Sequence, residues 1–362
     1  MRSAARTLAY WRIVVPAVAL VALAATWGSK PGSVVLAVVA VLLAGAVLAA
    51  VHHAEVIAAR VGEPFGSLVL AVAVTVIEVA LIVSVMRGGG PDKSTLARDT
   101  IFAAVMIICN GVIGLCLFVG GLRHHVQVFH VEGANSSLAV LIALATLSLV
   151  LPTFTTSAPA LSYTPAQLGF AAIASLALWL AFVFFQTVSH RDYFLPPGAA
   201  ADGDVPAAPP TPAVAWLSFA LLLVALVAVV GLAKVLSPSI ERALDAAGAP
   251  KATIGVAIAL LVLLPETVAA LRAARANRLQ TSLNLALGSA LASIGLTIPV
   301  VAVVAVWLGL PLVLGLEAKD LVLLALSFVV ASITLVSGRT TMLQGAVHAT
   351  IFAAFLFLAL VP

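Results

Sequence analysis

Long apolar runs separated by short polar segments follow one another along almost the whole chain. A helix that crosses the hydrocarbon layer of a bilayer needs about 20 mostly apolar residues. Eleven runs approach this length: 13–29, 34–54, 65–86, 99–121, 137–152, 166–188, 213–235, 252–271, 282–307, 319–337 and 341–361. The pattern therefore predicts an all-α polytopic membrane protein with eleven transmembrane helices.

The longest polar segment, residues 190–212, separates six predicted helices from the last five. It is rich in proline, alanine, glycine and aspartate, which is typical of a flexible linker. We therefore predict four regions: an extra N-terminal transmembrane helix in 1–33, a first five-helix repeat in 34–189, the linker in 190–212, and a second five-helix repeat in 213–362.

Composition supports the membrane assignment and excludes other classes. The 362 residues are 63% hydrophobic and 9% charged, and the mean hydropathy is +1.22. A soluble domain cannot bury that much apolar surface. The net charge of +4 is spread over short loops, so we expect no nucleic-acid partner. Ten Lys and Arg residues on one predicted side against eight on the other favour a cytoplasmic N-terminus slightly.

Two glutamates lie deep inside predicted transmembrane helices, Glu78 in 65–86 and Glu266 in 252–271. The other twelve of the fourteen acidic residues fall in loops or at helix ends. An acid at the bilayer centre costs a few kcal/mol and normally faces a bundle interior or an aqueous cavity. No Lys, Arg or His lies in the middle of a predicted helix except His348. We therefore expect both carboxyls to bind protons or a cation; a permanently protonated carboxyl is the structural alternative.

The surroundings of the two glutamates correspond. The glutamates lie on the third and eighth helices, which are an odd number apart and so cross the membrane in opposite directions. The helices that follow them also align, residues 96–115 with residues 279–298. This alignment sets three pairs of residues opposite one another: Asn110 and Ser293, Met106 and Ser289, Asp99 and Ser282. Such a pattern is typical of inverted-topology repeats, whose shared binding site lies near the membrane midplane.

Two carboxylates that converge inside a membrane can hold protons or a cation, but hardly both, because their repulsion is relieved by either one. Calcium takes about 6–8 oxygen ligands, and two glutamates supply at most four. Pro265 removes a helical hydrogen bond beside Glu266 and can free carbonyl groups. Further candidates for binding the cation or orienting its ligands are Thr75, Asn110, Ser289 and Ser293; close helix packing is their structural alternative.

Three stretches resemble the cation/proton exchanger branch of the calcium/cation antiporter superfamily, in particular its ChaA-type bacterial antiporters. They are GEPFGSLVLAVAVTVIEVALI (62–82), HHVQVFHVEGANSSLAVLIALATLSLVLPTFT (124–155) and RANRLQTSLNLALGSALASIGLTIP (275–299). The resemblance implies one extra N-terminal helix and two inverted five-helix repeats. It also implies a multi-pass protein of the bacterial inner membrane that exchanges Ca²⁺, or Na⁺ or K⁺, for H⁺ by alternating access.

By this resemblance, Glu78 and Glu266 correspond to the paired cation-binding glutamates of the family, and carbonyls near Val74 and Val262 to further ligands. The family usually carries a Gly-Asn pair whose Asn lies three residues before each glutamate. Here the equivalent pairs are Val74-Thr75 and Val262-Leu263. The missing amides leave the choice among Ca²⁺, Na⁺ and K⁺ open.

The sequence thus predicts a secondary active antiporter and not an enzyme, with no catalytic residue and no cofactor, and with cations, protons and membrane lipid as partners. A homo-oligomer is left open. An uncoupled cation channel and, further off, a membrane-embedded metalloenzyme are the alternatives. The metalloenzyme alternative rests on histidines that resemble those of membrane di-iron enzymes: His52, His53, His124, His125 and His130. Their spacings do not repeat and most lie at helix ends, where pH sensing by His124, His125 and His130 is a secondary use.

Overall fold

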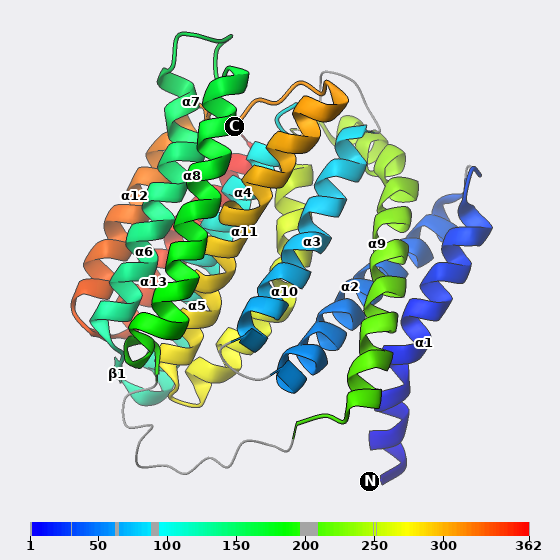
Figure 1. Ribbon diagram of the computed structural model, residues 1–362, viewed down its shortest axis with the longest axis horizontal. Coiled ribbons are helices and arrows are strands. Elements are labelled where there is room, and N and C mark those ends of the chain that lie inside the picture. The colour runs from blue at the N-terminus through cyan, green and yellow to red at the C-terminus, as the bar shows by residue number, and fades with distance from the viewer. Residues whose placement is uncertain are drawn as a thin grey trace. The chain divides into compact units, whose positions relative to one another are not determined.

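The computed structural model describes residues 2–29, 31–61, 65–87, 94–195, 209–248, 250 and 252–361. Helices make up most of it (Figure 1). In chain order the elements are α1 (Arg2–Thr26), α2 (Ser33–Val61), α3 (Phe65–Arg87), α4 (Leu96–Met106), η2 (Ile107–Val112), α5 (Ile113–His124), β1 (Gln127–Val128), α6 (Val131–Ala145), η3 (Thr146–Val150), α7 (Leu151–Phe154), α8 (Pro165–Phe184), η4 (Phe185–Ser189), η5 (Arg191–Phe194), α9 (Pro212–Ala247), α10 (Ala252–Arg275), α11 (Leu279–Leu308), α12 (Ala318–Val336), β2 (Arg339–Thr340) and α13 (Met342–Leu360).

The helices match the eleven predicted transmembrane segments. Within the described residues, nine helical spans are long and apolar enough to cross a membrane, and α1 and α3 add the shorter apolar stretches Tyr10–Thr26 and Val72–Met86. Because π-helical turns continue the backbone helix, α4, η2 and α5 form one span, and α6, η3 and α7 form another. The prediction of an all-helical polytopic membrane protein with eleven transmembrane helices is confirmed.

The chain divides into two compact units, each built from both halves of the sequence. The first unit contains Met1–Gly90 and Pro206–Ala249, and the second contains Pro91–Val205 and Pro250–Pro362. In the first unit α2 packs along α9, and α1 and α3 contact both of these helices. The predicted repeats, 34–189 and 213–362, follow one another along the chain, whereas each compact unit contains residues from both. The repeats therefore stay a prediction. Part of the predicted linker, 196–208, lies outside the described residues.

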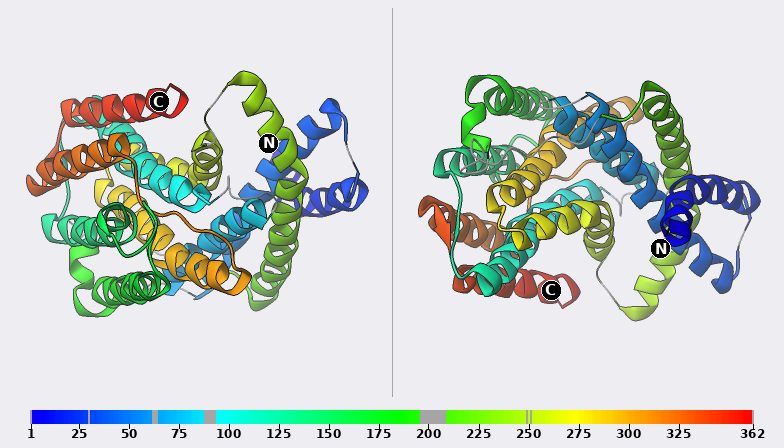
Figure 2. Two further views of the ribbon diagram at one scale, coloured as in Figure 1. Left: turned by 90° about the horizontal axis from the view of Figure 1, so that it is seen from above. Right: turned by 90° about the horizontal axis from the view of Figure 1, so that it is seen from below.

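In the second unit α11 is the central helix. It contacts α4, α5, α6, α8 and α10, while α13 packs along α5, and α10 along α4 (Figure 2). One end of this unit holds the antiparallel pair β1–β2, in which Gln127 faces Thr340 and Val128 faces Arg339. We call this end the β edge and the other end of the unit the opposite edge.

Hydrogen bonds show which helix ends meet at the β edge. His124 Nε2, at the end of α5, lies 3.0 Å from the Arg275 carbonyl at the end of α10. The His130 amide, just before α6, donates to Gln280 Oε1 in the first turn of α11 (2.7 Å). Gln280 Nε2 donates to the Tyr193 carbonyl in η5, which follows α8 (3.4 Å). Thus α5, α8 and α10 run toward this edge, whereas α6 and α11 start from it.

The opposite edge collects the other helix ends. The Val313 amide, beyond the end of α11, donates to the Ser94 carbonyl just before α4 (3.0 Å). Thr153 Oγ1 in α7 donates to the Leu316 carbonyl, just before α12 (2.9 Å). Therefore α4 and α12 start here, and α7 and α11 end here. Since β2 follows α12 and precedes α13, α12 ends and α13 starts at the β edge.

Glycines allow α5 and α13 to approach closely. A Cβ on Gly345 would collide with the backbone of Phe118, and one on Gly114 would lie 2.8 Å from His348 Cβ. Membrane helices associate through such small residues because lipid gives no hydrophobic drive for their association. This contact fixes α13 against the helix that carries Asn110.

Gly345→Ala should therefore destabilise the protein, because backbone atoms of Phe118 cannot yield to a methyl group as a side chain can. We expect a free energy of unfolding lower by about 1–3 kcal/mol, measured as a lower Tm in detergent. Gly169→Ala in α8 is the control, since nothing lies within 4 Å of a Cβ there. Equal melting of the two variants would contradict the close contact.

Candidate cation site

In the first unit, α3 buries the predicted ligands of its span together. Glu78 is 4% exposed, Thr75 5% and Val74 5%. The three residues lie within four positions of one another on a helix, so Val74 and Glu78 share a face one turn apart. A carboxyl buried in a strip of apolar helix is the feature that the sequence predicted at this position.

In the second unit, Glu266 lies on α10 and is partly exposed, and Val262, one turn earlier, is buried. Helix α10 runs unbroken through Pro265. Because proline has no N–H, the Leu261 carbonyl still loses its usual helical donor. Pro265 thus frees one carbonyl near Glu266 without opening the helix.

The serines of α11 lie on the helix beside α10. Ser293 is 3% exposed and Ser289, one turn earlier, is partly exposed. Glu266 and these two hydroxyl groups therefore belong to neighbouring helices of one unit. Glu78 belongs to the other unit, and its pairing with Glu266 stays a prediction.

The structure places Asn110 in the π-helical turn η2, where it is fully buried. Its Nδ2 donates to Ser327 Oγ on α12 (2.8 Å), and its Oδ1 lies 3.1 Å from His348 Nδ1 on α13. Ser327 and Thr334, which lie seven residues apart on α12, were not predicted from the sequence. Their spacing of seven residues in an apolar helix puts both on one face, and this signal is present in the sequence.

No clustered metal centre is present in the described part of the chain: no group of three or more His, Cys, Asp or Glu side chains is placed to hold a metal ion. A cation bound by only two glutamates needs further oxygen ligands. Carbonyl, hydroxyl and amide oxygens near the glutamates are therefore the groups on which cation binding would depend.

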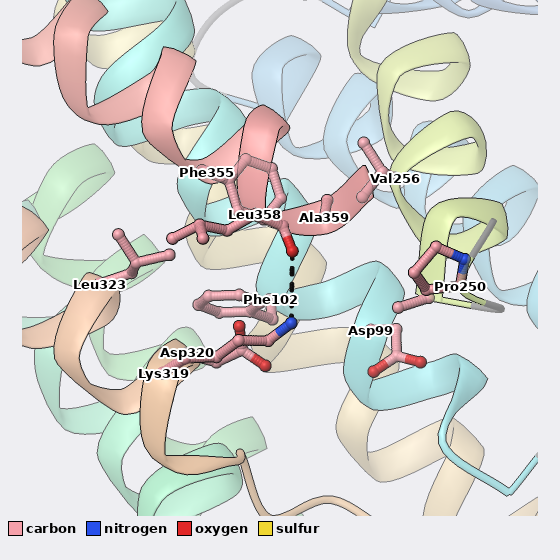
Figure 3. A pocket seen from close by; sticks show the side chains of 11 residues that line it. Asp99, Phe102, Pro250, Val256, Lys319, Asp320, Leu323, Phe355, Leu358 and Ala359 are labelled. Atoms are coloured by element: carbon pink, nitrogen blue, oxygen red, sulfur yellow. Dashed lines mark hydrogen bonds between the residues drawn. The ribbon is translucent and has the colours of Figure 1, made fainter. Parts of the chain in front are cut away.

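A small cavity of about 40 Å³ lies at the opposite edge of the second unit, between α4, α10, α12 and α13 (Figure 3). Asp99, Lys319 and Asp320 are its charged lining residues. Lys319 Nζ donates to the Leu358 carbonyl (3.3 Å) at the end of α13. None of the eight predicted ligands lines this cavity, so it is separate from the candidate cation site.

Asp99 beside the cavity is held by a buried ion pair. Its Oδ1 accepts from Arg98 Nε (2.8 Å) and its Oδ2 from Thr95 Oγ1 (2.9 Å). Arg98 Nη1 also donates to the Gly315 carbonyl (3.1 Å). The pair thus joins the start of α4 to the segment between α11 and α12.

In the described part of the chain, the nine apolar spans and two shorter apolar helices, one of which buries the Glu78 carboxyl, define a polytopic membrane protein. The family model of the sodium/calcium exchanger protein matches residues 32–188 and 217–361. The chain therefore belongs to the sodium/calcium exchanger protein family, and the sequence-based resemblance is confirmed.

Two relatives cover almost the whole chain. The putative ionic transporter y4hA of Sinorhizobium fredii is 53% identical over 321 residues, which are 89% of this chain and 87% of that one. The sodium-potassium/proton antiporter ChaA of Escherichia coli is 36% identical over 349 residues, 95% of this chain and 94% of that one.

Solved structures show the same fold. Native YfkE superimposes with a TM-score of 0.74 at 17% identity, covering 97% of this chain and 100% of the other. The H⁺/Ca²⁺ exchanger CAX gives a TM-score of 0.72 at 16% identity and covers 99% of this chain and 89% of the other. The fold of this chain is therefore that of these exchangers.

Arg98→Met tests the buried ion pair. Because the variant leaves the Asp99 carboxyl buried without its cation, we expect a loss of about 3–5 kcal/mol in the free energy of unfolding. The double variant Arg98→Met/Asp99→Asn should recover most of the lost Tm in detergent. Wild-type melting of Arg98→Met would show that the pair contributes nothing to stability.

Proposed function

We propose that this protein is a secondary active antiporter that exchanges a cation for protons across a membrane. The observation that carries the proposal is the Glu78 carboxyl, 4% exposed within an apolar span. Its predicted partner Glu266 lies on another apolar span, α10. The relatives support the reaction type, since ChaA is a sodium-potassium/proton antiporter and a 28% identical protein of Aphanothece halophytica is a Ca(2+)/H(+) antiporter.

Coupling follows from the charge of the two carboxyls. Two ionised glutamates brought together in an apolar layer repel each other, so the empty site takes up protons. A bound cation neutralises the same carboxylates and displaces those protons. If the unloaded, charged site cannot reorient across the membrane, cation and proton movements become coupled in opposite directions.

The proposed ligand set joins the glutamates to neighbouring oxygens. Thr75 and the Val74 carbonyl accompany Glu78, and the Val262 carbonyl accompanies Glu266. The hydroxyls of Ser289 and Ser293 and the amide of Asn110 bind the cation or orient its ligands. Calcium prefers many oxygen ligands, while an incomplete set favours a monovalent ion, so Ca²⁺, Na⁺ and K⁺ all remain substrates to test.

The directions of the helices support inverted repeats. In the second unit, α4–α5 runs opposite to α11, α6–α7 opposite to α12, and α8 opposite to α13, and each pair holds equivalent places in the two halves of the chain. The contacts correspond as well, because α13 packs on α5 as α8 packs on α11. Both α8 and α13 start with a capping box, Thr164 with Gln167 and Thr341 with Gln344.

The charges of the second unit support a cytoplasmic β edge, and through it a cytoplasmic N-terminus. Exposed arginines gather at the β edge: Arg123, Arg191, Arg272, Arg275, Arg278 and Arg339. Among the described residues of this unit, the opposite edge has only Lys319 and the ion-paired Arg98 as basic residues. Arginine and lysine accumulate on the cytoplasmic side of membrane proteins.

Exchange should be measured as cation-induced pH change in everted membrane vesicles, with Ca²⁺, Na⁺ and K⁺ compared. Glu78→Gln and Glu266→Gln should each lower proton flux by more than about tenfold, because the neutral amide cannot bind protons or balance the cation's charge. Glu132→Gln, an exposed acid at the β edge, is the control. Intact exchange in both glutamine variants would refute the mechanism, and cation current without proton flux would indicate a channel.

The orientation is tested with single introduced cysteines, since the native Cys109 and Cys116 are buried. A membrane-impermeant maleimide added to intact cells should label Ala318→Cys at the opposite edge. Val128→Cys in β1 should react only after the membrane is permeabilised. The reverse pattern of labelling would place the β edge outside.

A further inference from the structure

Four buried polar side chains connect three spans of the second unit at the level of η2. Asn110 comes from η2, Ser327 and Thr334 from α12, and His348 from α13; none is more than 2% exposed. His348 Nε2 lies 3.1 Å from Thr334 Oγ1. With the contacts of Asn110 to His348 and Ser327, this gives one continuous chain of hydrogen bonds.

The chain of hydrogen bonds has a defined direction. Ser327 Oγ donates to the Leu323 carbonyl (2.7 Å), so its oxygen is left to accept from Asn110. Met106 Sδ, 3.9 Å from Asn110 Nδ2, is also an acceptor. Both neighbours thus require the NH₂ end of the amide, and Asn110 Oδ1 must face His348. The neutral imidazole therefore carries its hydrogen on Nδ1 and accepts from Thr334 at Nε2.

This arrangement leaves Asn110 Oδ1 able to bind a second partner. A carbonyl oxygen has two lone pairs, and His348 uses one of them. Without the imidazole N–H, the described contacts would hold the amide through its NH₂ end, and its oxygen would lose the donor that fixes its direction. Only the oxygen can bind a cation, so the orientation of the amide matters for the site.

The π-helical turn needs the same support. Asn110, which His348 contacts, belongs to this turn. π-helical turns inside α-helices occur frequently at functional sites, and in an apolar layer a freed backbone carbonyl requires a partner. The close approach of α13 at Gly114 puts the His348 Cβ next to this helix.

We propose that His348 is a positioning residue for cation exchange: its Nδ1–H holds the Asn110 amide, and the turn Ile107–Val112, in the orientation that the cation site uses. This proposal rests on the proposed function. It gives a role to the one histidine that the sequence places deep in a transmembrane helix.

Two conservative variants separate the two ring nitrogens. His348→Asn puts an amide N–H near the place of Nδ1, whereas His348→Gln puts one near the place of Nε2 and leaves Asn110 without its donor. In proteoliposomes, with Ca²⁺, Na⁺ and K⁺ each titrated, His348→Gln should raise the KM for the transported cation about tenfold with kcat nearly unchanged. His348→Asn should keep the KM within about twofold.

A mutant cycle shows whether His348 acts through Asn110. The double variant Asn110→Ala/His348→Gln should have the same KM as Asn110→Ala alone, because the amide that His348 holds is already gone. Ser175→Ala is the control for loss of a buried hydroxyl contact, since Ser175 is fully buried and pairs with Ser148 (3.4 Å) outside this cluster.

The proposal is overturned by a wild-type KM in His348→Gln, by an equal rise in His348→Asn, or by additive effects in the cycle. Absence of exchange in the wild-type protein would instead overturn the proposed function. A measurement independent of transport and of variant folding is ¹⁵N NMR of the wild-type imidazole, assigned by the signal missing from His348→Asn. We expect a hydrogen on Nδ1, and a neutral ring with its hydrogen on Nε2 would contradict the proposal.

Discussion

A carboxylate in the apolar layer of a membrane needs a counter-charge, and the proposed function of this protein depends on this requirement. Glu78 is buried in an apolar helix, and the sequence supplies no basic residue in mid-span apart from His348. His348 is committed to Asn110 and Thr334 in the other unit. In the proposed site, protons or a cation supply this counter-charge in turn, which is the chemical basis of exchange between a cation and protons.

Two groups of buried polar side chains in the second unit obey the same constraint on a smaller scale. Arg98 and Asp99 neutralise each other, and Arg98 also bonds the Gly315 carbonyl. The amide of Asn110 is satisfied at both ends, and the ring of His348 at both nitrogens. Buried polar groups that are fully paired favour one arrangement of their helices. We infer that such pairing keeps these helices of the second unit in register.

The sequence was sufficient for the helices because eleven long apolar runs have few alternative interpretations in a membrane. It was sufficient for the family because the stretches 62–82, 124–155 and 275–299 resemble it. It predicted the fifth helix too short, from residue 137, whereas α6 starts at Val131. The residues between them include Gly133 and Ala134, which are buried against protein, so low hydropathy there does not signal a loop. Hydropathy also cannot show π-helical turns, since one extra residue in a turn leaves an apolar run unchanged.

The candidate site was predictable as residue types but not as contacts. Asn110 and His348 are 238 positions apart, and no periodicity within one helix links them. The seven-residue spacing of Ser327 and Thr334 on α12 is visible in the sequence. Their partners come together only because α13 packs on α5. Pro265 was expected to disturb α10 and does so at a single carbonyl, because neighbouring backbone bonds hold the helix together.

The most direct test of the central claim is the release of protons when a cation binds to the purified protein in weakly buffered detergent solution. If protons and cation compete for the same carboxyls, binding of Ca²⁺, Na⁺ or K⁺ should release about one to two protons per cation, and fewer as the pH is raised until the carboxyls are ionised before binding. Saturable cation binding with no proton release at any pH would contradict the account.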